Sequence, residues 1–170
     1  MNIKKYIRDI ENFPTKGVVF KDITPLLGNS KSLVFTADAL LKLVVDVKVD
    51  KVIGMESRGF FFATLLATKL DAGFVPVRKK GKLPHNTLAE QYSLEYGEDV
   101  LEIHEDAIKA GENVLIHDDV LATGGTAKAV CNLVERLGGN IVQCNFLIEL
   151  DFLNGRDELS AYNVQSLLHY

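Results

Sequence analysis

Two adjacent carboxylates, Asp118 and Asp119, stand directly before a glycine-rich turn. The turn consists of Ala122, Thr123, Gly124, Gly125 and Thr126. Backbone N–H groups of a loop that opens a helix attract anions, and glycine lets a phosphate approach the main chain closely. Carboxylates would repel that phosphate, but they accept hydrogen bonds from hydroxyl groups. The order of the two motifs therefore indicates a ligand with a phosphate and nearby vicinal hydroxyls, such as ribose 5-phosphate.

These motifs need a strand before them and a helix after them. The apolar run Val114–Ile116 fits a buried parallel strand. Apolar residues then recur with helical spacing at Val130, Leu133, Val134 and Leu137. The alternative is an acidic strand end that runs into an ordinary helix N-cap at Thr123 or Thr126. Neither a G-x-x-x-x-G-K-[ST] loop nor a G-x-G-x-x-G motif occurs, which excludes a nucleotide P-loop and gives a dinucleotide fold no support.

A second switch from strand to helix is expected at Glu56–Gly59, with the sequence E-S-R-G. Helix-opening amides and the Arg58 guanidinium could hold a diphosphate, because arginine matches phosphate oxygens in a bidentate way. An N-cap at Ser57 with a solvated Arg58 explains the motif equally well. The basic cluster Arg78–Lys82 could bind the same anion, although such clusters are more commonly solvated loops.

The remaining chain alternates between strand and helix patterns, which favours βαβ units and a parallel sheet. The expected helices are Ile3–Glu11, Ser30–Asp46 and Gly59–Leu70. A turn, a short strand and a turn are expected within Phe13–Leu27. The other expected strands are Lys51–Met55, Gly73–Val77, Asn113–His117 and Ile141–Leu150, the last followed by a short tail. A mobile loop is expected over Lys79–Glu90, followed by an antiparallel piece over Tyr92–Tyr96 and Val100–Ile103.

The composition is that of an ordinary globular protein. With 170 residues, 47% hydrophobic and 25% charged, the chain can form a single domain with a substantial core. The net charge of −4 argues against a nucleic-acid surface. The two cysteines, Cys131 and Cys144, lack metal-ligand spacing and are expected to be buried free thiols. Neither an apolar leader nor a membrane-length apolar run is visible, so a cytoplasmic location is expected.

The run Val114–Thr126, V-L-I-H-D-D-V-L-A-T-G-G-T, resembles the phosphoribosyl-diphosphate (PRPP) motif of type I phosphoribosyltransferases. Three further segments extend the resemblance over nearly the full length: Phe13–Leu27, Gly54–Phe60 and Arg78–Gly97. The PRPP motif alone identifies only the superfamily. The N-terminal segment and the run Y-S-L-E-Y-G are more specific to the members that use adenine. The resemblance implies a purine-salvage reaction in which adenine and PRPP give AMP and diphosphate.

The resemblance also implies a role for particular residues. PRPP would be held by Arg58, Asp118, Asp119, Ala122, Thr123, Gly124, Gly125 and Thr126. The diphosphate group would be held by Glu56, Ser57, Arg58, Arg78, Lys79 and Lys82. Adenine would be bound by Val19, Phe20, Lys21 and Val120. Glu95 would handle a proton on the purine as the glycosidic bond forms, with Tyr96 near the closed loop. Mg²⁺ would be carried by PRPP rather than by direct protein ligands.

Selection of adenine has to come from hydrogen bonds, because stacking on Phe20 tolerates any base. A main-chain carbonyl within Val19–Lys21 would accept from the exocyclic amine of adenine. The oxygen of hypoxanthine or guanine would instead face another acceptor and leave it unpaired.

Two residues depart from the family pattern, and one backbone feature is expected to follow it. Lys21 stands where arginine is usual, which replaces a planar fork by a point charge. His117 stands where apolar residues are usual, and it is expected to be packed at the strand end rather than catalytic. The family often has a non-proline cis peptide in the second loop, and here that peptide would join Glu56 to Ser57.

The predicted fold is α/β, with a central parallel sheet flanked by helices and a small N-terminal hood. One domain is expected over residues 1–170, with the hood at about 1–30 and the mobile loop at about 79–97. The resemblance further implies a homodimer. Two other functions stay open from the sequence: a PRPP-binding regulatory protein that binds nucleic acid, and a phosphoribosyltransferase for another base. The regulator would need a basic face or a DNA-binding extension, and neither is visible.

Overall fold

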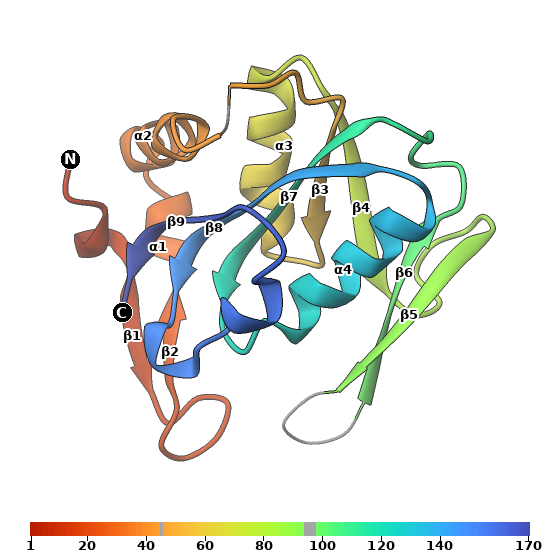
Figure 1. Ribbon diagram of the computed structural model, residues 1–170. Coiled ribbons are helices and arrows are strands. Elements are labelled where there is room, and N and C mark those ends of the chain that lie inside the picture. Colours follow the sequence, from red (N-terminus) through yellow and green to blue (C-terminus); the bar gives the residue numbers. More distant parts are fainter. Residues whose placement is uncertain (45, 94–97) are drawn as a thin grey trace. The chain divides into compact units, whose positions relative to one another are not determined.

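The computed structural model describes residues 1–44, 46–93 and 98–170, which fall into two compact units, Met1–Lys42 and Leu43–Tyr170 (Figure 1). The first unit contains the segment predicted as the hood and continues through the helix that follows it. Throughout the residues described, no helix has the length and apolar character needed to cross a membrane.

The N-terminal unit consists of a two-stranded hairpin and short helices. Its elements are η1 (Ile3–Tyr6), β1 (Arg8–Glu11), β2 (Val19–Asp22), α1 (Thr24–Leu27) and α2 (Ser30–Leu41). The short strand predicted within Phe13–Leu27 is confirmed as β2. The helix predicted over Ser30–Asp46 ends at Leu41 because a segment rich in valine follows, and β-branched residues have low helix propensity.

The helix predicted over Ile3–Glu11 is wrong beyond Tyr6, because the next residues form strand β1. This strand pairs antiparallel with β2. Arg8 Nη2 lies 2.6 Å from Asp22 Oδ2, and Lys21 Nζ lies 2.8 Å from Asp9 Oδ1. These contacts join residues that are distant in sequence, so local helical spacing could not reveal them.

The described residues of the C-terminal unit form a seven-stranded mixed sheet in the order β5-β6-β4-β3-β7-β8-β9 (Figure 1). The strands are β3 (Lys51–Met55), β4 (Gly73–Lys79), β5 (Thr87–Ser93), β6 (Glu98–His104), β7 (Asn113–Leu121), β8 (Asn140–Glu149) and β9 (Val164–His169). Strands β4, β3, β7, β8 and β9 pair in parallel, which confirms the predicted parallel core. Strands β6 and β5 add an antiparallel edge.

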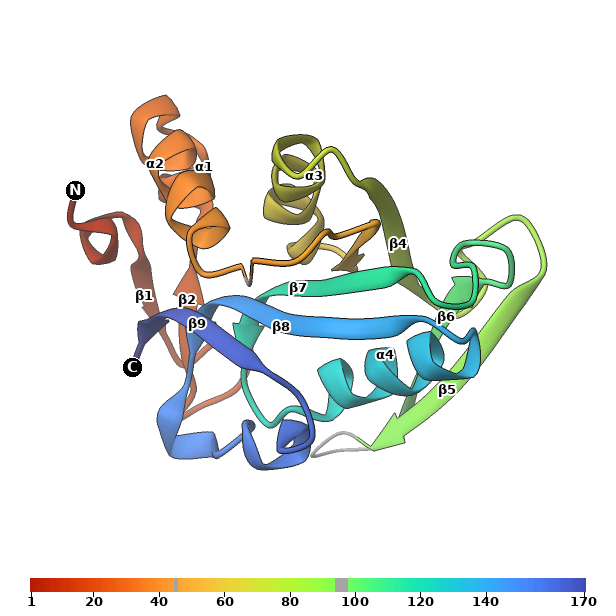
Figure 2. The same ribbon diagram turned by 45° about the horizontal axis from the view of Figure 1, so that its top comes forward.

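Helices α3 (Gly59–Lys69) and α4 (Gly125–Arg136) cover opposite faces of this sheet (Figure 2). Both begin where the sequence predicts. Three of the apolar residues used to predict α4, namely Val130, Leu133 and Val134, are completely buried. Burial of each such side chain contributes about 1.5–3 kcal/mol relative to exposure. The amphipathic pattern therefore fixes the face of α4 that packs on the sheet.

Several strands are longer than predicted, including β4, β6 and β7. Strand β7 continues past His117 to Leu121, because β8 keeps pairing with it, for example Asp118 with Phe146. The carboxylate pair therefore lies on the strand itself rather than in the loop. The predicted loop over Lys79–Glu90 is wrong from Thr87 onward, where β5 begins and pairs with β6. The predicted antiparallel piece is confirmed for Tyr92 and Ser93, which belong to β5, and for Val100–Ile103 in β6, whereas its residues 94–96 lie outside the described residues.

The tail after β8 has more structure than the sequence suggests. It forms the short 3-10 helices η2 (Asp151–Leu153) and η3 (Asp157–Leu159) and then strand β9. Strand β9 pairs in parallel with β8, for example Val164 with Cys144. The tail thus adds the last strand of the sheet.

Candidate functional site

The candidate site lies at the carboxyl edge of the parallel strands, where the chain connections change direction. From β3 the chain passes through α3 to β4 on one side, and from β7 it passes through α4 to β8 on the other. Since β3 and β7 are neighbours, the loops that follow them, 56–58 and 122–124, leave the same edge of the sheet. Open α/β sheets bind ligands at such topological switch points.

The acidic pair and Arg58 meet at this edge. Asp119 is only 4% exposed, and its Oδ2 lies 2.9 Å from Arg58 Nε. Asp118 Oδ1 accepts a hydrogen bond of 2.8 Å from the main-chain N–H of Asp119. Burial, with the neighbouring Asp119, raises the pKa of Asp118. Burial also raises the pKa of Asp119, although the Arg58 charge opposes it. Two motifs remote in sequence are therefore in direct contact.

The close approach of the two loops requires glycine at position 59. A Cβ atom added to Gly59 would lie 2.6 Å from Asp118 Oδ1 and 3.2 Å from the carbonyl oxygen of His117. Any larger side chain would displace the Asp118 carboxylate. The glycine of E-S-R-G thus allows α3 to start directly against the acidic pair.

The glycine-rich turn encloses a small cavity of about 60 Å³. Gly124 has a φ of +87°, in the left-handed region that glycine adopts at low cost. Helix α4 begins at Gly125, so the amides of its first turn have no acceptor within the helix and can bind an anion. The lining residues are Asp118, Val120, Leu121, Ala122, Thr123, Gly124, Thr126 and Ala127. Val120, predicted for adenine, thus lies on the wall of this cavity.

Gly155 packs against the main chain of the glycine-rich turn, and this residue was not predicted from the sequence as part of the site. A Cβ atom on Gly155 would collide with the carbonyl oxygen of Ala122 and would lie 2.9 Å from the amide nitrogen of Gly124. Both contacts are to main-chain atoms, which cannot move aside as a side chain can. The neighbouring Asn154 has a φ of +52°, so the dipeptide Asn154-Gly155 is a turn signal that could have drawn attention to this segment.

The basic residues predicted for diphosphate gather around Glu56. Arg78 Nε lies 3.4 Å from Glu56 Oε2, and the ammonium group of Lys82 forms an ion pair with Glu56 Oε1. Lys79 Nζ instead lies 2.9 Å from Asp99 Oδ2. The peptide bond between Glu56 and Ser57 is cis, as expected.

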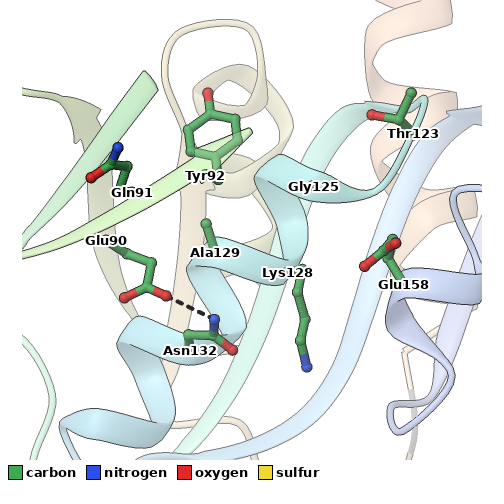
Figure 3. Close-up of a pocket in the computed structure, with 9 residues that line it drawn as sticks. All are labelled: Glu90, Gln91, Tyr92, Thr123, Gly125, Lys128, Ala129, Asn132 and Glu158. Atoms are coloured by element: carbon green, nitrogen blue, oxygen red, sulfur yellow. Dashed lines mark hydrogen bonds between the residues drawn. The ribbon is translucent and has the colours of Figure 1, made fainter. Parts of the chain in front are cut away.

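A larger cavity of about 410 Å³ adjoins the turn and shares Thr123 and Gly125 with it (Figure 3). Its other walls come from β5, α4 and η3, through Glu90, Gln91, Tyr92, Lys128, Ala129, Asn132 and Glu158. None of these residues was predicted. The Tyr92 hydroxyl is 3.4 Å from Asp99 Oδ2 and also hydrogen-bonds to Thr126. Strand β5 thereby contacts the glycine-rich turn.

The residues predicted for adenine in the N-terminal unit lie on β2. The ring of Phe20 packs edge-on against Phe13, with centroids 5.1 Å apart. Phe13 itself is 51% exposed. The Lys21 ammonium is paired with Asp9, as described above. The hairpin therefore presents an aromatic pair with a fixed geometry.

Comparisons with known proteins cover most or all of the chain and agree with one another. Residues 29–167 match the family model of the phosphoribosyl transferase domain. The adenine phosphoribosyltransferase of Christiangramia forsetii is 62% identical over 170 residues, which are 100% of this chain and 99% of that protein. The chain belongs to the adenine phosphoribosyltransferase family. This confirms the resemblance inferred from the PRPP motif and the N-terminal segment.

Solved structures of the family share the fold. The enzyme of Rhodothermus marinus is 54% identical and superposes with a TM-score of 0.94, over 99% of this chain and 96% of that one. The enzyme of Saccharomyces cerevisiae, crystallised with adenine and an imino-altritol bisphosphate, is 45% identical with a TM-score of 0.92, over 98% and 96% of the two chains. The mixed sheet with flanking helices is therefore the fold of this family.

Glu95, predicted as the catalytic residue, and Tyr96 lie outside the described residues. Their roles stay predictions. The other predicted residues of the C-terminal unit gather at the carboxyl edge of β3, β4 and β7, within the loops and strand ends described above.

His117, which departs from the family pattern, is packed in place as expected. Its ring is completely buried, and Nδ1 lies 3.0 Å from Asn145 Oδ1. The ring of Phe62 packs against it, with centroids 6.4 Å apart. Burial lowers the pKa of His117 to about 4, although the hydrogen bonds that its ring donates to Asn145 act in the opposite direction.

This pKa predicts a loss of stability in mild acid. Because the folded-state pKa lies below the ordinary 6.5, the unfolded chain binds the proton more tightly. The contribution of neutral His117 is complete above pH 6.5 and is lost as the pH falls toward 4, by about 3 kcal/mol. Urea unfolding of the native protein and of His117→Gln at pH 7 and pH 4 measures this loss of stability. If the free energy of unfolding falls equally in the two proteins between pH 7 and pH 4, the lowered pKa of His117 is contradicted.

Proposed function

We propose that this chain transfers the phosphoribosyl group of PRPP to adenine and releases diphosphate. The contact of Arg58 with Asp119, beside a helix-opening glycine turn, carries the proposal. It brings an anion-binding cation, hydroxyl acceptors and a phosphate cradle to one edge of the sheet. Family membership supports the same reaction and makes a PRPP-binding regulator the weaker alternative.

In this proposal each group acts on a different part of PRPP. The amides of Gly124–Thr126 and the threonine hydroxyls hold the 5′-phosphate. Asp118 and Asp119 accept hydrogen bonds from the ribose hydroxyls, and Arg58 turns part of its guanidinium toward the diphosphate. Because the anomeric carbon becomes cationic as diphosphate leaves, fixed charges that stabilise this separation lower the barrier.

Glu95 and the hairpin residues complete the proposed reaction. Glu95 handles the proton of the purine, and Phe20 stacks on the base while main-chain groups of Val19–Lys21 select adenine. Mg²⁺ is a part of the substrate, bound to PRPP and neutralising its diphosphate. Asp119 already has the Arg58 guanidinium as its partner, which fits a metal brought by the substrate.

We also propose that the protein is a cytoplasmic homodimer. The cysteines Cys131 and Cys144 are both buried and free, with their sulfur atoms 3.7 Å apart. Buried free thiols fit a reducing compartment. The homodimer rests on the family resemblance, and sedimentation of the purified chain measures it.

The experiment is an assay of adenine, PRPP and Mg²⁺ with the purified protein. We expect equimolar formation of AMP and diphosphate, and loss of turnover when EDTA removes Mg²⁺. PRPP binding without product would favour the regulator. Absence of both binding and product would contradict the whole proposal.

A further inference from the structure

Glu56 is held rigidly at the first position after β3. Its main-chain N–H donates to the carbonyl oxygen of Val77 on β4 at 2.9 Å. Its side chain is only 9% exposed, although it lies at the edge of the sheet that carries the candidate site. A buried carboxylate at such a position requires partners, because burying an unpaired charge is costly.

Those partners are the basic groups of the following strand and loop. Glu56 Oε1 accepts from Arg78 Nη2 at 3.4 Å and from the Lys82 ammonium. Glu56 Oε2 accepts from the main-chain N–H of Lys79 at 3.0 Å. Arg78 Nη1 also donates to the carbonyl oxygen of Lys82 at 3.2 Å. One carboxylate thus fixes two cations and the backbone that carries them.

This arrangement is unsuited to direct diphosphate binding by Glu56. Both of its oxygens are occupied, and a carboxylate would repel the anion. Burial raises its pKa, but the hydrogen bonds from Lys82, Lys79 and Arg78 together lower it to about 2, so it is charged at neutral pH. Glu56 with Arg78 and Lys82 therefore carries a net charge of about +1, which attracts an anion.

We propose that Glu56 is a positioning residue that holds Arg78 and Lys82 as a paired-cation clamp for the diphosphate of PRPP. The inference rests on the proposed function and replaces the predicted role of Glu56 as a ligand. Arg78 and Lys82 are 34% and 46% exposed, so each keeps part of its surface open to a ligand. A guanidinium has five N–H donors and an ammonium has three, so a shared carboxylate leaves donors for phosphate oxygens.

The test compares Glu56→Gln with the control Glu105→Gln. Glu105 is exposed and lies in the turn after β6, outside the strand and loop that carry Arg78 and Lys82. We expect Glu56→Gln to raise the KM for PRPP and the calorimetric Kd for Mg·PRPP about tenfold, the effect of one lost charge-assisted contact. The kcat, the KM for adenine and the control variant should stay close to native values. Glu56→Asp carries the same test if the glutamine variant does not fold.

A double-mutant cycle with Lys82→Met separates positioning from general damage. If Glu56 acts through the clamp, Glu56→Gln should cost much less in the Lys82→Met background than in the native one. Equal costs in both backgrounds would overturn the proposal, as would an unchanged or lower Kd for Mg·PRPP in Glu56→Gln. The proposed function fails separately, if the native protein binds Mg·PRPP but does not convert adenine.

Discussion

Replacement of Gly155 by alanine is expected to reduce kcat/KM for PRPP by about 100-fold, because a displacement near 1 Å in a positioned site has that effect. The added methyl group collides with main-chain atoms of Ala122 and Gly124, which belong to the turn that we propose binds phosphate. The turn then has to move, and its amides would no longer point at the 5′-phosphate that we propose they bind. Steady-state kinetics with varied PRPP measures the effect.

Gly73→Ala is the matched control for this substitution. Its added methyl group meets the Lys51 side chain at 3.1 Å, and a lysine side chain can rotate away. We expect the kinetics of Gly73→Ala to stay native. Both variants should give the far-UV circular dichroism spectrum of a folded protein. A Gly155→Ala protein with native PRPP kinetics would show that the cradle does not depend on this contact.

Glu95→Gln is expected to lower kcat by about 10²- to 10⁴-fold, the usual range for a general acid or base. The PRPP affinity should change little, because the proposed proton transfer takes place at the purine. The exposed Glu105 provides a control, through Glu105→Gln. Native turnover by Glu95→Gln would remove this residue from the mechanism.

The parallel core was predictable because each strand and helix carries its own local signal. The apolar run Val114–Ile116 and the helical spacing of Val130, Leu133 and Val134 suffice to place β7 and α4. The motifs then gather at one edge of the sheet by topology alone. Contact between Arg58 and Asp119 follows from the parallel pairing of β3 with β7.

The features that escaped prediction depend on contacts between distant residues. Strand β1 forms by pairing with β2, and β9 forms by pairing with β8. Gly155 packs against the turn at Ala122, although helix α4 and strand β8 lie between these two residues in the sequence. The carboxylate of Glu56 pairs with cations that lie 22 and 26 residues further along the chain. No local pattern in the sequence indicates these pairs, so Glu56 was predicted from the sequence as a ligand.

Base choice tests the central claim of adenine transfer most directly. Adenine, hypoxanthine and guanine are compared at equal concentration with PRPP and Mg²⁺, for the native protein and for Lys21→Ala. Main-chain groups of Val19–Lys21 are expected to select the base, and an unpaired buried acceptor costs about 1–3 kcal/mol. Adenine should therefore be preferred by both proteins, with lower efficiency for Lys21→Ala. Equal efficiency with hypoxanthine or guanine in the native protein would contradict the claim and leave only PRPP-dependent transfer.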